Sequence, residues 1–269
     1  MSGLNAAVIG LGVIGSAQLA LLGPMVRVAY DVKTGEPYPK RAIGGCDFAV
    51  ICVGTPQGED GRADLTALHA ALGRLPDRMP VMIRSTVPPG TVASLEARRG
   101  PVVHVPEFMY ERAGGEWKTP RDVPFMICGG TRKAVEWFQP VVAAMAGGPV
   151  WCCTGLEAEL VKYTANCFLA AKVTFVNEMA RVCEAFGADW GTVRQGWLHD
   201  PRPGKTHTAI EGHEPGFGGA CLPKDLSALI KASEKAGYMP EFLWAVEEAN
   251  ARFKAGEESG ECAGRAHGH

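Results

Sequence analysis

The chain has 269 residues, of which 46% are hydrophobic and 21% charged, with a formal net charge of −2. This length suffices for two domains with a substantial core, and the charge argues against a basic surface for nucleic acid. No apolar run reaches the ~18 residues of a membrane helix, and no basic segment followed by an apolar run marks a signal peptide. We therefore expect a cytoplasmic protein without nucleic-acid or membrane partners.

The nine cysteines are odd in number and scattered, and no CxxC spacing indicates a zinc site. Cys152 and Cys153 are adjacent, so they are poorly placed to pair with each other. The cysteines in or beside apolar runs, predicted to be small core residues, are Cys46, Cys52, Cys128, Cys167 and Cys183. This pattern favours a reducing, cytosolic compartment and no bound metal.

The chain opens with a strand, a glycine-rich turn and a helix. Residues 6–9 are apolar, Gly10-Leu11-Gly12-Val13-Ile14-Gly15 follows, and residues 16–22 have a helical pattern. Such a turn lets a pyrophosphate approach the free N–H groups of the helix. A second strand, residues 26–30, ends at Asp31, an acid suited to the ribose hydroxyls of NAD. Lys33 either contacts the cofactor or is solvated. The predicted NAD contacts in this region are Gly10, Gly12, Val13, Ile14, Gly15, Asp31 and Lys33.

Strands and helices then alternate, which is typical of an open α/β sheet. Further strands are expected at 48–53, 81–84, 102–105, 125–128 and 150–153, with helices at 64–75 and 131–145. Residues 34–47 contain two prolines and two glycines, so the second crossover is expected to be a loop. The prediction is a Rossmann-like, doubly wound, mostly parallel sheet in an NAD-binding domain of residues 1–153.

Polar residues follow several of these strands, at the carboxyl edge where such sheets bind ligands. Thr55, Thr86 and Glu107 each lie just beyond a strand, and Phe108 follows Glu107. Thr86 has an alternative interpretation as a helix cap. The strand ends are therefore candidate binding positions.

A second domain is expected from Thr154, where Thr154-Gly155-Leu156-Glu157 forms a capping box. A long helix to Phe186 has no internal proline, and it carries Lys162 and Asn166 on one face, suited to an oxyanion or simply to solvent. Asp189 is a plausible cap for a helix at 190–198. Helices at 224–236 and 240–253 complete a small helical domain, residues 154–254, and residues 255–269 are expected to be disordered.

The stretch from Gly216 to Asp225 places Cys221 after a glycine run and before Pro223, Lys224 and Asp225. Glycines permit close approach of a ligand, and a neighbouring cation favours the nucleophilic thiolate. The alternative interpretation is a tight turn with a buried cysteine.

Several motifs in order make nearly the whole chain resemble the UDP-glucose/GDP-mannose dehydrogenases, NAD-dependent enzymes that oxidise a nucleotide-sugar alcohol to the carboxylate. They are Gly10-Leu11-Gly12-Val13-Ile14-Gly15, Val53-Gly54-Thr55-Pro56, Ser85-Thr86-Val87-Pro88-Pro89-Gly90-Thr91, Pro106-Glu107-Phe108, the helix from Lys162 to Glu178 with Asn166, Asp200-Pro201-Arg202-Pro203-Gly204 and Gly218-Gly219-Ala220-Cys221-Leu222-Pro223-Lys224-Asp225.

The resemblance implies a four-electron oxidation, UDP-glucose to UDP-glucuronate, through a thiohemiacetal and a thioester on Cys221. It implies that Lys162 and Asn166 hold the oxyanion and that Asp225, with Lys162 and a water, handles the alcohol proton. Glu107 would assist thioester hydrolysis, with Thr86 placing the water. The remaining implied contacts are, for NAD, Val53, Gly54, Thr55, Ser85, Thr86 and Lys224, and, for the sugar nucleotide, Glu107, Phe108, Met109, Lys162, Asn166, Arg202, Phe217, Gly218 and Cys221.

The resemblance also implies a homodimer through the long helix, with Arg202 supplied across it. The chain departs from the family's pattern in three places. We expect a short form without the family's third, C-terminal domain, the second crossover is trimmed, and His213-Glu214 replace a Pro-Gly found in many relatives. The alternatives are UDP-N-acetylmannosamine or GDP-mannose oxidation, a two-domain hydroxyacid dehydrogenase, which would have no use for Cys221, and an inactive, truncated NAD or nucleotide-sugar binding protein.

Overall fold

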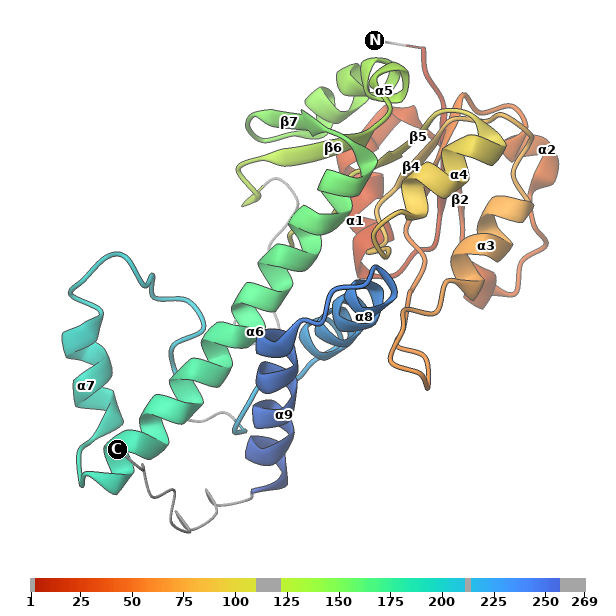
Figure 1. Ribbon diagram of the computed structural model, residues 1–269. Helices are drawn as coiled ribbons and strands as arrows, with labels where there is room; N and C mark the ends of the chain where they lie inside the picture. The colour runs from red at the N-terminus through yellow and green to blue at the C-terminus, as the bar shows by residue number, and fades with distance from the viewer. Residues whose placement is uncertain (1–2, 110–121, 211–213, 257–269) are drawn as a thin grey trace. The chain divides into compact units, whose positions relative to one another are not determined.

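The chain divides into two compact units, residues 1–163 and 164–269. The computed structural model describes residues 3–109, 122–210 and 214–256 of them (Figure 1). The division falls inside helix α6 (Gly155–Ala185), which is continuous through it. The sequence analysis placed the boundary at Thr154, immediately before this helix begins.

The first unit is built on a seven-stranded sheet in the order β2-β1-β3-β4-β5-β6-β7. Its strands are β1 (Ala6–Ile9), β2 (Val26–Tyr30), β3 (Phe48–Ile51), β4 (Val81–Ile83), β5 (Val102–His104), β6 (Met126–Gly130) and β7 (Val150–Cys153). All neighbours pair in parallel except β5 with β6. The predicted Rossmann-like, mostly parallel sheet is confirmed.

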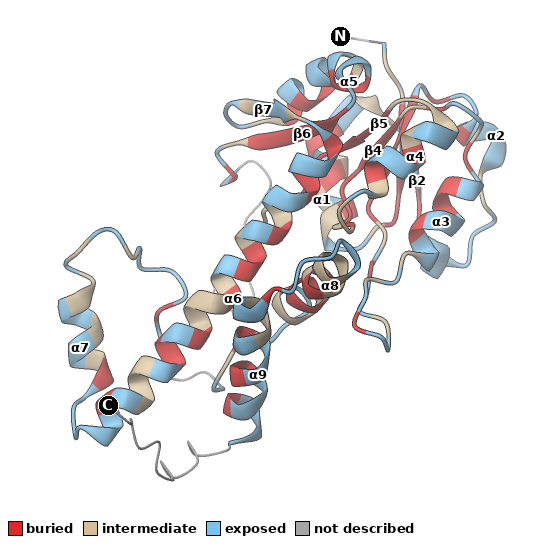
Figure 2. Ribbon diagram, in the orientation of Figure 1, coloured by how far each residue is buried: buried red, intermediate tan, exposed pale blue. Residues whose placement is uncertain are grey.

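Helices cover both faces of this sheet, so its central strands are apolar on both sides (Figure 2). Residues of α1 (Val13–Leu22) and α5 (Arg132–Met145) pack on one face, where the Phe48 and Phe138 rings meet edge to face at 5.8 Å. Residues of α2 (Lys40–Ile43), α3 (Thr66–Gly73) and α4 (Thr91–Arg99) pack on the other. Two short 3₁₀ helices, η1 (Gly23–Met25) and η2 (Val32–Thr34), flank β2.

The second crossover differs from the expected loop. It retains the single helical turn α2, because the fully buried Ile43 packs against the sheet as a crossover helix would. Tyr38 lies just before this turn and packs on Tyr30, with ring centroids 5.2 Å apart. The prolines and glycines shortened the helix without removing its contact with the core.

The described part of the second unit is helical. It contains the rest of α6, α7 (Trp190–Trp197), α8 (Leu222–Lys235) and α9 (Glu241–Ala255). Its core includes Cys167, Phe217 and Leu226. The predicted cap holds, since the Asp189 carboxylate accepts from the Thr192 amide at 2.7 Å. The predicted disordered tail lies outside the described residues from 257 onward, whereas Ala255 ends α9.

The glycine-rich turn is packed against the protein itself at two of its glycines. Gly10 has a φ of +90°, and a Cβ there would lie 2.8 Å from the Cys52 carbonyl. A Cβ on Gly15 would lie 1.7 Å from the Gly10 oxygen, a backbone atom that cannot move aside. At Gly12 an added Cβ would meet nothing within 4 Å. In the described part of the chain, none of the helices has the length and apolarity to cross a membrane.

We expect Gly15→Ala to lower the free energy of unfolding by about 1–3 kcal/mol, because the extra methyl forces the α1 turn off the first strand. The control is Gly12→Ala, which adds the same methyl into open space and is expected to change stability by at most ~0.5 kcal/mol. Urea unfolding followed by circular dichroism measures both. Equal stability of the two variants would contradict the packing described for Gly15.

Candidate active site

The N-terminus of α1 has the features of a dinucleotide site. Gly12 is its N-cap and provides no side-chain cap, and its first turn contains no acid. Such an end attracts an anion such as a pyrophosphate, and the open space at Gly12 lets one come close. The open space at Gly12 therefore suits a bound ligand, whereas Gly10 and Gly15 are required by the close packing of the turn against the protein backbone.

Asp31 lies beside this turn at the end of β2. Its carboxylate accepts from the amides of Leu11 at 2.6 Å and Lys33 at 2.8 Å. These backbone N–H groups hold the pKa of Asp31 below its usual range, so the carboxylate is ionised and oriented. A charged acceptor here fits ribose hydroxyls. The Lys33 side chain is exposed, and a contact with the cofactor remains a prediction.

The loops after β3 and β4 are joined by two side-chain hydrogen bonds. The Ser85 hydroxyl donates to the Val53 carbonyl at 2.6 Å, and the Thr55 hydroxyl donates to the Thr86 carbonyl at 2.8 Å. Gly54, between them, is exposed. Thr86 does not cap α4, whose N-cap is Gly90. The alternative interpretation of Thr86 as a helix cap is therefore wrong.

Glu107 is buried and held from several sides. It forms an ion pair with Arg84, which is 1% exposed, and accepts from the amides of Phe108 at 2.9 Å and Met109 at 3.0 Å. The fully buried Gln18 of α1 donates to it at 3.4 Å. Sequence analysis missed Arg84 and Gln18. A charged residue directly after the buried β4 was the available signal, since such a residue must find a partner.

Lys162 and His104 lie in the same unit. The Lys162 ammonium stands 4.9 Å above the centroid of the Phe108 ring, a cation–π distance. Burial lowers the pKa of His104 to about 3, and the nearby cations Arg84 and Lys162 add to the effect. His104 is therefore neutral, and no sequence signal singled it out.

In the second unit, the predicted residues Cys221, Lys224 and Asp225 lie at the start of α8, and a fourth, Asn166 of α6, bonds to Asp225. Asp225 is buried, accepts from the Asn166 side-chain amide at 2.5 Å and is ion-paired with Lys224. One turn earlier, Cys221 is exposed and is the N-cap of α8, and its carbonyl accepts from the Asp225 amide at 3.0 Å. The alternative of a buried Cys221 is wrong. Lys224, predicted to contact NAD, lies against Asp225.

The glycine run before Cys221 is anchored by two buried asparagines that sequence analysis missed. The Asn250 amide group bonds to both the N–H and the carbonyl of Phe217, and Asn177 accepts from the Gly216 amide at 3.0 Å. The Phe217 ring lies in the core of this unit, whereas Gly218 is exposed, and a substrate contact of either residue stays a prediction. The sequence signal for Asn250 was its position as a polar residue on the otherwise apolar, buried face of α9.

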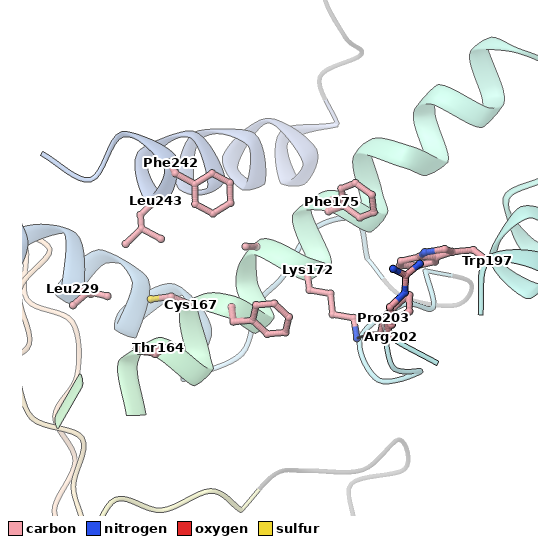
Figure 3. Close-up of a pocket in the computed structure, with 12 residues that line it drawn as sticks. Thr164, Cys167, Lys172, Phe175, Trp197, Arg202, Pro203, Leu229, Phe242 and Leu243 are labelled. Carbon is pink, nitrogen blue, oxygen red and sulfur yellow. Dashed lines mark hydrogen bonds between the residues drawn. The ribbon is translucent and has the colours of Figure 1, made fainter. Parts of the chain in front are cut away.

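Arg202 borders an apolar cavity of about 580 Å³ in the second unit (Figure 3). The aromatic side chains of Phe168, Phe175 and Phe242 line it. Arg202 itself is exposed and bonds to Asp200 at 2.8 Å. Within the described ranges, no group of three or more His, Cys, Asp or Glu side chains is arranged to hold a metal ion.

Two models of one family match the chain. The NAD binding domain of the UDP-glucose/GDP-mannose dehydrogenase family matches residues 33–115, and the central domain of that family matches residues 156–252. The match to an NAD binding domain confirms the cofactor prediction, and it agrees with the features of the α1 N-terminus and Asp31.

Known proteins similar to this chain include a UDP-glucose 6-dehydrogenase of Pseudomonas aeruginosa, 38% identical over 231 residues that make up 79% of this chain and 50% of that protein. A solved UDP-glucose dehydrogenase from Pyrobaculum islandicum has a TM-score of 0.76 and 27% identity, covering 95% of this chain and 69% of that one. A UDP-D-ManNAc dehydrogenase from Pyrococcus horikoshii has a TM-score of 0.79 and 25% identity, covering 94% and 69%.

The chain spans about half the length of the curated relatives it matches. Together the two family models cover most of the chain, with residues 116–155 unmatched between them. On this evidence, the chain belongs to the UDP-glucose/GDP-mannose dehydrogenase family.

Proposed function

We propose that this chain oxidises the primary alcohol of a nucleotide sugar to the carboxylate, using a covalent bond to Cys221. The observation that carries the proposal is the exposed Cys221 at the N-cap of α8, one turn from the buried Asp225. An exposed thiol at a helix N-terminus is accessible to an electrophilic carbon of a bound substrate. A hydroxyacid dehydrogenase would have no use for a nucleophile at this position.

In this proposal, NAD when bound accepts one hydride in each of two oxidations. The Cys221 sulfur bonds to the carbon of the sugar aldehyde, giving a thiohemiacetal whose second oxidation leaves a thioester. Water attacks that carbon, the C–S bond breaks, and the carboxylate and the thiolate are released. Atoms and charges balance with one water consumed, two hydrides (four electrons) removed and about three protons released for each alcohol oxidised to the carboxylate.

In this proposal, different side chains transfer the protons, stabilise the oxyanion and assist hydrolysis. Asp225 is held by Asn166 and Lys224, and it takes the alcohol proton through a water with the help of Lys162. Asn166 donates one amide hydrogen to Asp225, and in this proposal its other amide hydrogen and Lys162 stabilise the oxyanion. Glu107 assists thioester hydrolysis, and Thr86 helps to place the water.

UDP-glucose is the proposed substrate, because the curated relatives of this chain include UDP-glucose 6-dehydrogenases that are 38% and 36% identical to it. UDP-N-acetylmannosamine and GDP-mannose are the alternatives, supported by solved relatives named for these sugars. An inactive NAD or nucleotide-sugar binding protein is the alternative from another class. The cytoplasmic compartment stays a prediction.

We also propose a homodimer through α6. Large apolar side chains are exposed on this helix at intervals of seven residues, at Val161, Phe168, Phe175 and Val182. That spacing keeps them on one side of the helix, as at the seam of two packed helices. Phe168 is 64% and Phe175 52% exposed, and two such exposed rings on one side of a helix are unusual in a monomer.

The first prediction for this function is its stoichiometry. With excess NAD, we expect about two NADH per UDP-glucose consumed, because an alcohol-to-acid oxidation removes four electrons. Absorbance of NADH and chromatography of the sugar nucleotides measure the ratio. A ratio of one would contradict the acid product, and no NADH from any of the three sugar nucleotides would favour the inactive binding protein.

The second concerns the thiol. Cys221→Ser is expected to lower acid release by at least about 10³-fold, because a hydroxyl forms and breaks such adducts far less readily. Cys152→Ser removes another exposed thiol and is the matched control, with activity expected to be unchanged. Acid production by Cys221→Ser at the normal rate would rule out covalent catalysis.

The third concerns assembly. The double substitution Phe168→Asp and Phe175→Asp is expected to convert a dimer to a monomer, because it places two carboxylates in an apolar seam. Sedimentation velocity measures the mass. Trp151→Asp, at an exposed position of β7, is the control and should stay dimeric. A wild-type chain that sediments as a monomer at tens of micromolar would contradict the proposal.

A further inference from the structure

Glu159 is a charged side chain with no place in the chemistry above, yet it is fully buried in the second turn of α6. Its two carboxylate oxygens accept from two backbone amides of another segment. Oε2 accepts from the Gly90 N–H at 2.6 Å, and Oε1 accepts from the Val92 N–H at 2.7 Å. These bonds join α6 to the loop before α4 and to the first turn of α4.

The two amides belong to the N-terminus of α4. Gly90 is its N-cap, no side chain of the local sequence caps it, and its first turn contains no acid. A helix that begins in this way leaves its first N–H groups without partners. Glu159 therefore supplies from a distance the cap that residues 86–91 do not contain, and its charge also suits the positive end of the helix.

Packing around the carboxylate leaves little freedom. A Cβ on Gly155, one turn before Glu159, would lie 2.6 Å from the Val92 Cγ1 atom. The first turn of α6 thus rests directly on the first turn of α4. The hydrogen bonds and this contact fix the two helix ends against each other.

The loop that Glu159 holds is the one that carries Thr86. Its other end is fixed by the bonds from Ser85 to Val53 and from Thr55 to Thr86. Lys162 follows Glu159 by three residues, so the two share a face of α6. One carboxylate therefore sets the distance between the Thr86 loop and the turn that carries Lys162.

We propose that Glu159 is a positioning residue, which ties the Thr86 loop to helix α6 and thereby keeps Thr86 and Lys162 at a fixed distance from each other. The roles of Thr86 and Lys162 rest on the proposed function, whereas the hydrogen bonds between Glu159 and the amides of Gly90 and Val92 do not depend on it. Glu159 acts through these two residues and touches neither substrate nor cofactor.

The electrostatics of the site agree with this role. Burial raises the pKa of Glu159 to about 7, although the amides of Val92, Gly90 and Thr91 oppose the rise. A raised folded-state pKa means that the contribution of this group to stability is full below its unfolded value and declines as pH rises through about 7. Ionisation of the buried Glu159 therefore lowers the free energy of unfolding, and the hydrogen bonds from the Gly90 and Val92 amides offset part of this cost.

Hydrogen exchange of the Gly90 and Val92 amides, followed by NMR, tests the tie without any need for activity. In Glu159→Gln we expect their protection to fall at least tenfold, because the amide group offers one acceptor where two are used. Glu157→Gln is the matched control, since Glu157 is exposed and caps only its own helix through Thr154. Unchanged protection in Glu159→Gln, or an equal loss in the control, would overturn the tie.

Kinetics then test the positioning. We expect Glu159→Gln to lower kcat at least about tenfold, since small misplacements of catalytic groups are costly, while the Kd for NAD changes less than twofold. Lost amide protection with an unchanged kcat would overturn the positioning role. If the wild-type chain oxidises no nucleotide sugar, the proposed function fails and the exchange experiment still decides the tie.

A pH series separates the carboxylate from a general loss of packing. Relative to Glu159→Gln, the wild-type urea midpoint should decline between about pH 4.5 and pH 7, whereas Glu157→Gln should follow the wild type. Parallel curves for wild type and Glu159→Gln would overturn the assignment. If Glu159→Gln does not fold, Glu159→Asp replaces it in these experiments, because it keeps the charge but is one methylene shorter. It should show the same loss of protection at the Gly90 and Val92 amides.

Discussion

A buried ion pair, Arg84 with Glu107, is the interaction on which much of the first unit depends. Taking both charges out of water is costly, and removing one partner would leave the other uncompensated, at about 3–5 kcal/mol. The Arg84 guanidinium also donates to the Val105 carbonyl at 2.6 Å. It thereby binds the end of β4 to the backbone beyond β5. Glu107 in turn accepts from Phe108, the residue over whose ring Lys162 stands.

A chain of fixed groups therefore extends from the sheet to the first turns of α6. Hydrogen bonds between the β3 and β4 loops lie on one side of it, and the capping of α4 by Glu159 lies on the other. In the second unit, Asn166 and Lys224 hold Asp225 in a similar way. Each unit thus contains a buried carboxylate that is held in place by an ion pair and hydrogen bonds.

The sequence predicted the sheet well because every strand is a short apolar run bounded by turn residues, and the observed strand ends lie within two residues of the predicted ones. It did not predict α4. That helix has no acid in its first turn and no local cap, and the group that caps it lies on α6. The tie of Gln18 to Glu107 and the placement of Phe217 in a core were likewise set by residues distant in sequence, which no local pattern records.

The position of Cys221 has a consequence for how the protein ages. Burial raises the pKa of the Cys52, Cys128 and Cys167 thiols to about 12, so these sulfurs stay protonated and inert. Cys221 is exposed at a helix N-terminus beside a lysine. Peroxide reacts with thiolates and passes over protonated thiols. The exposure that the proposed role of Cys221 requires therefore also leaves this sulfur, like that of Cys152, open to an oxidation from which the buried thiols are protected.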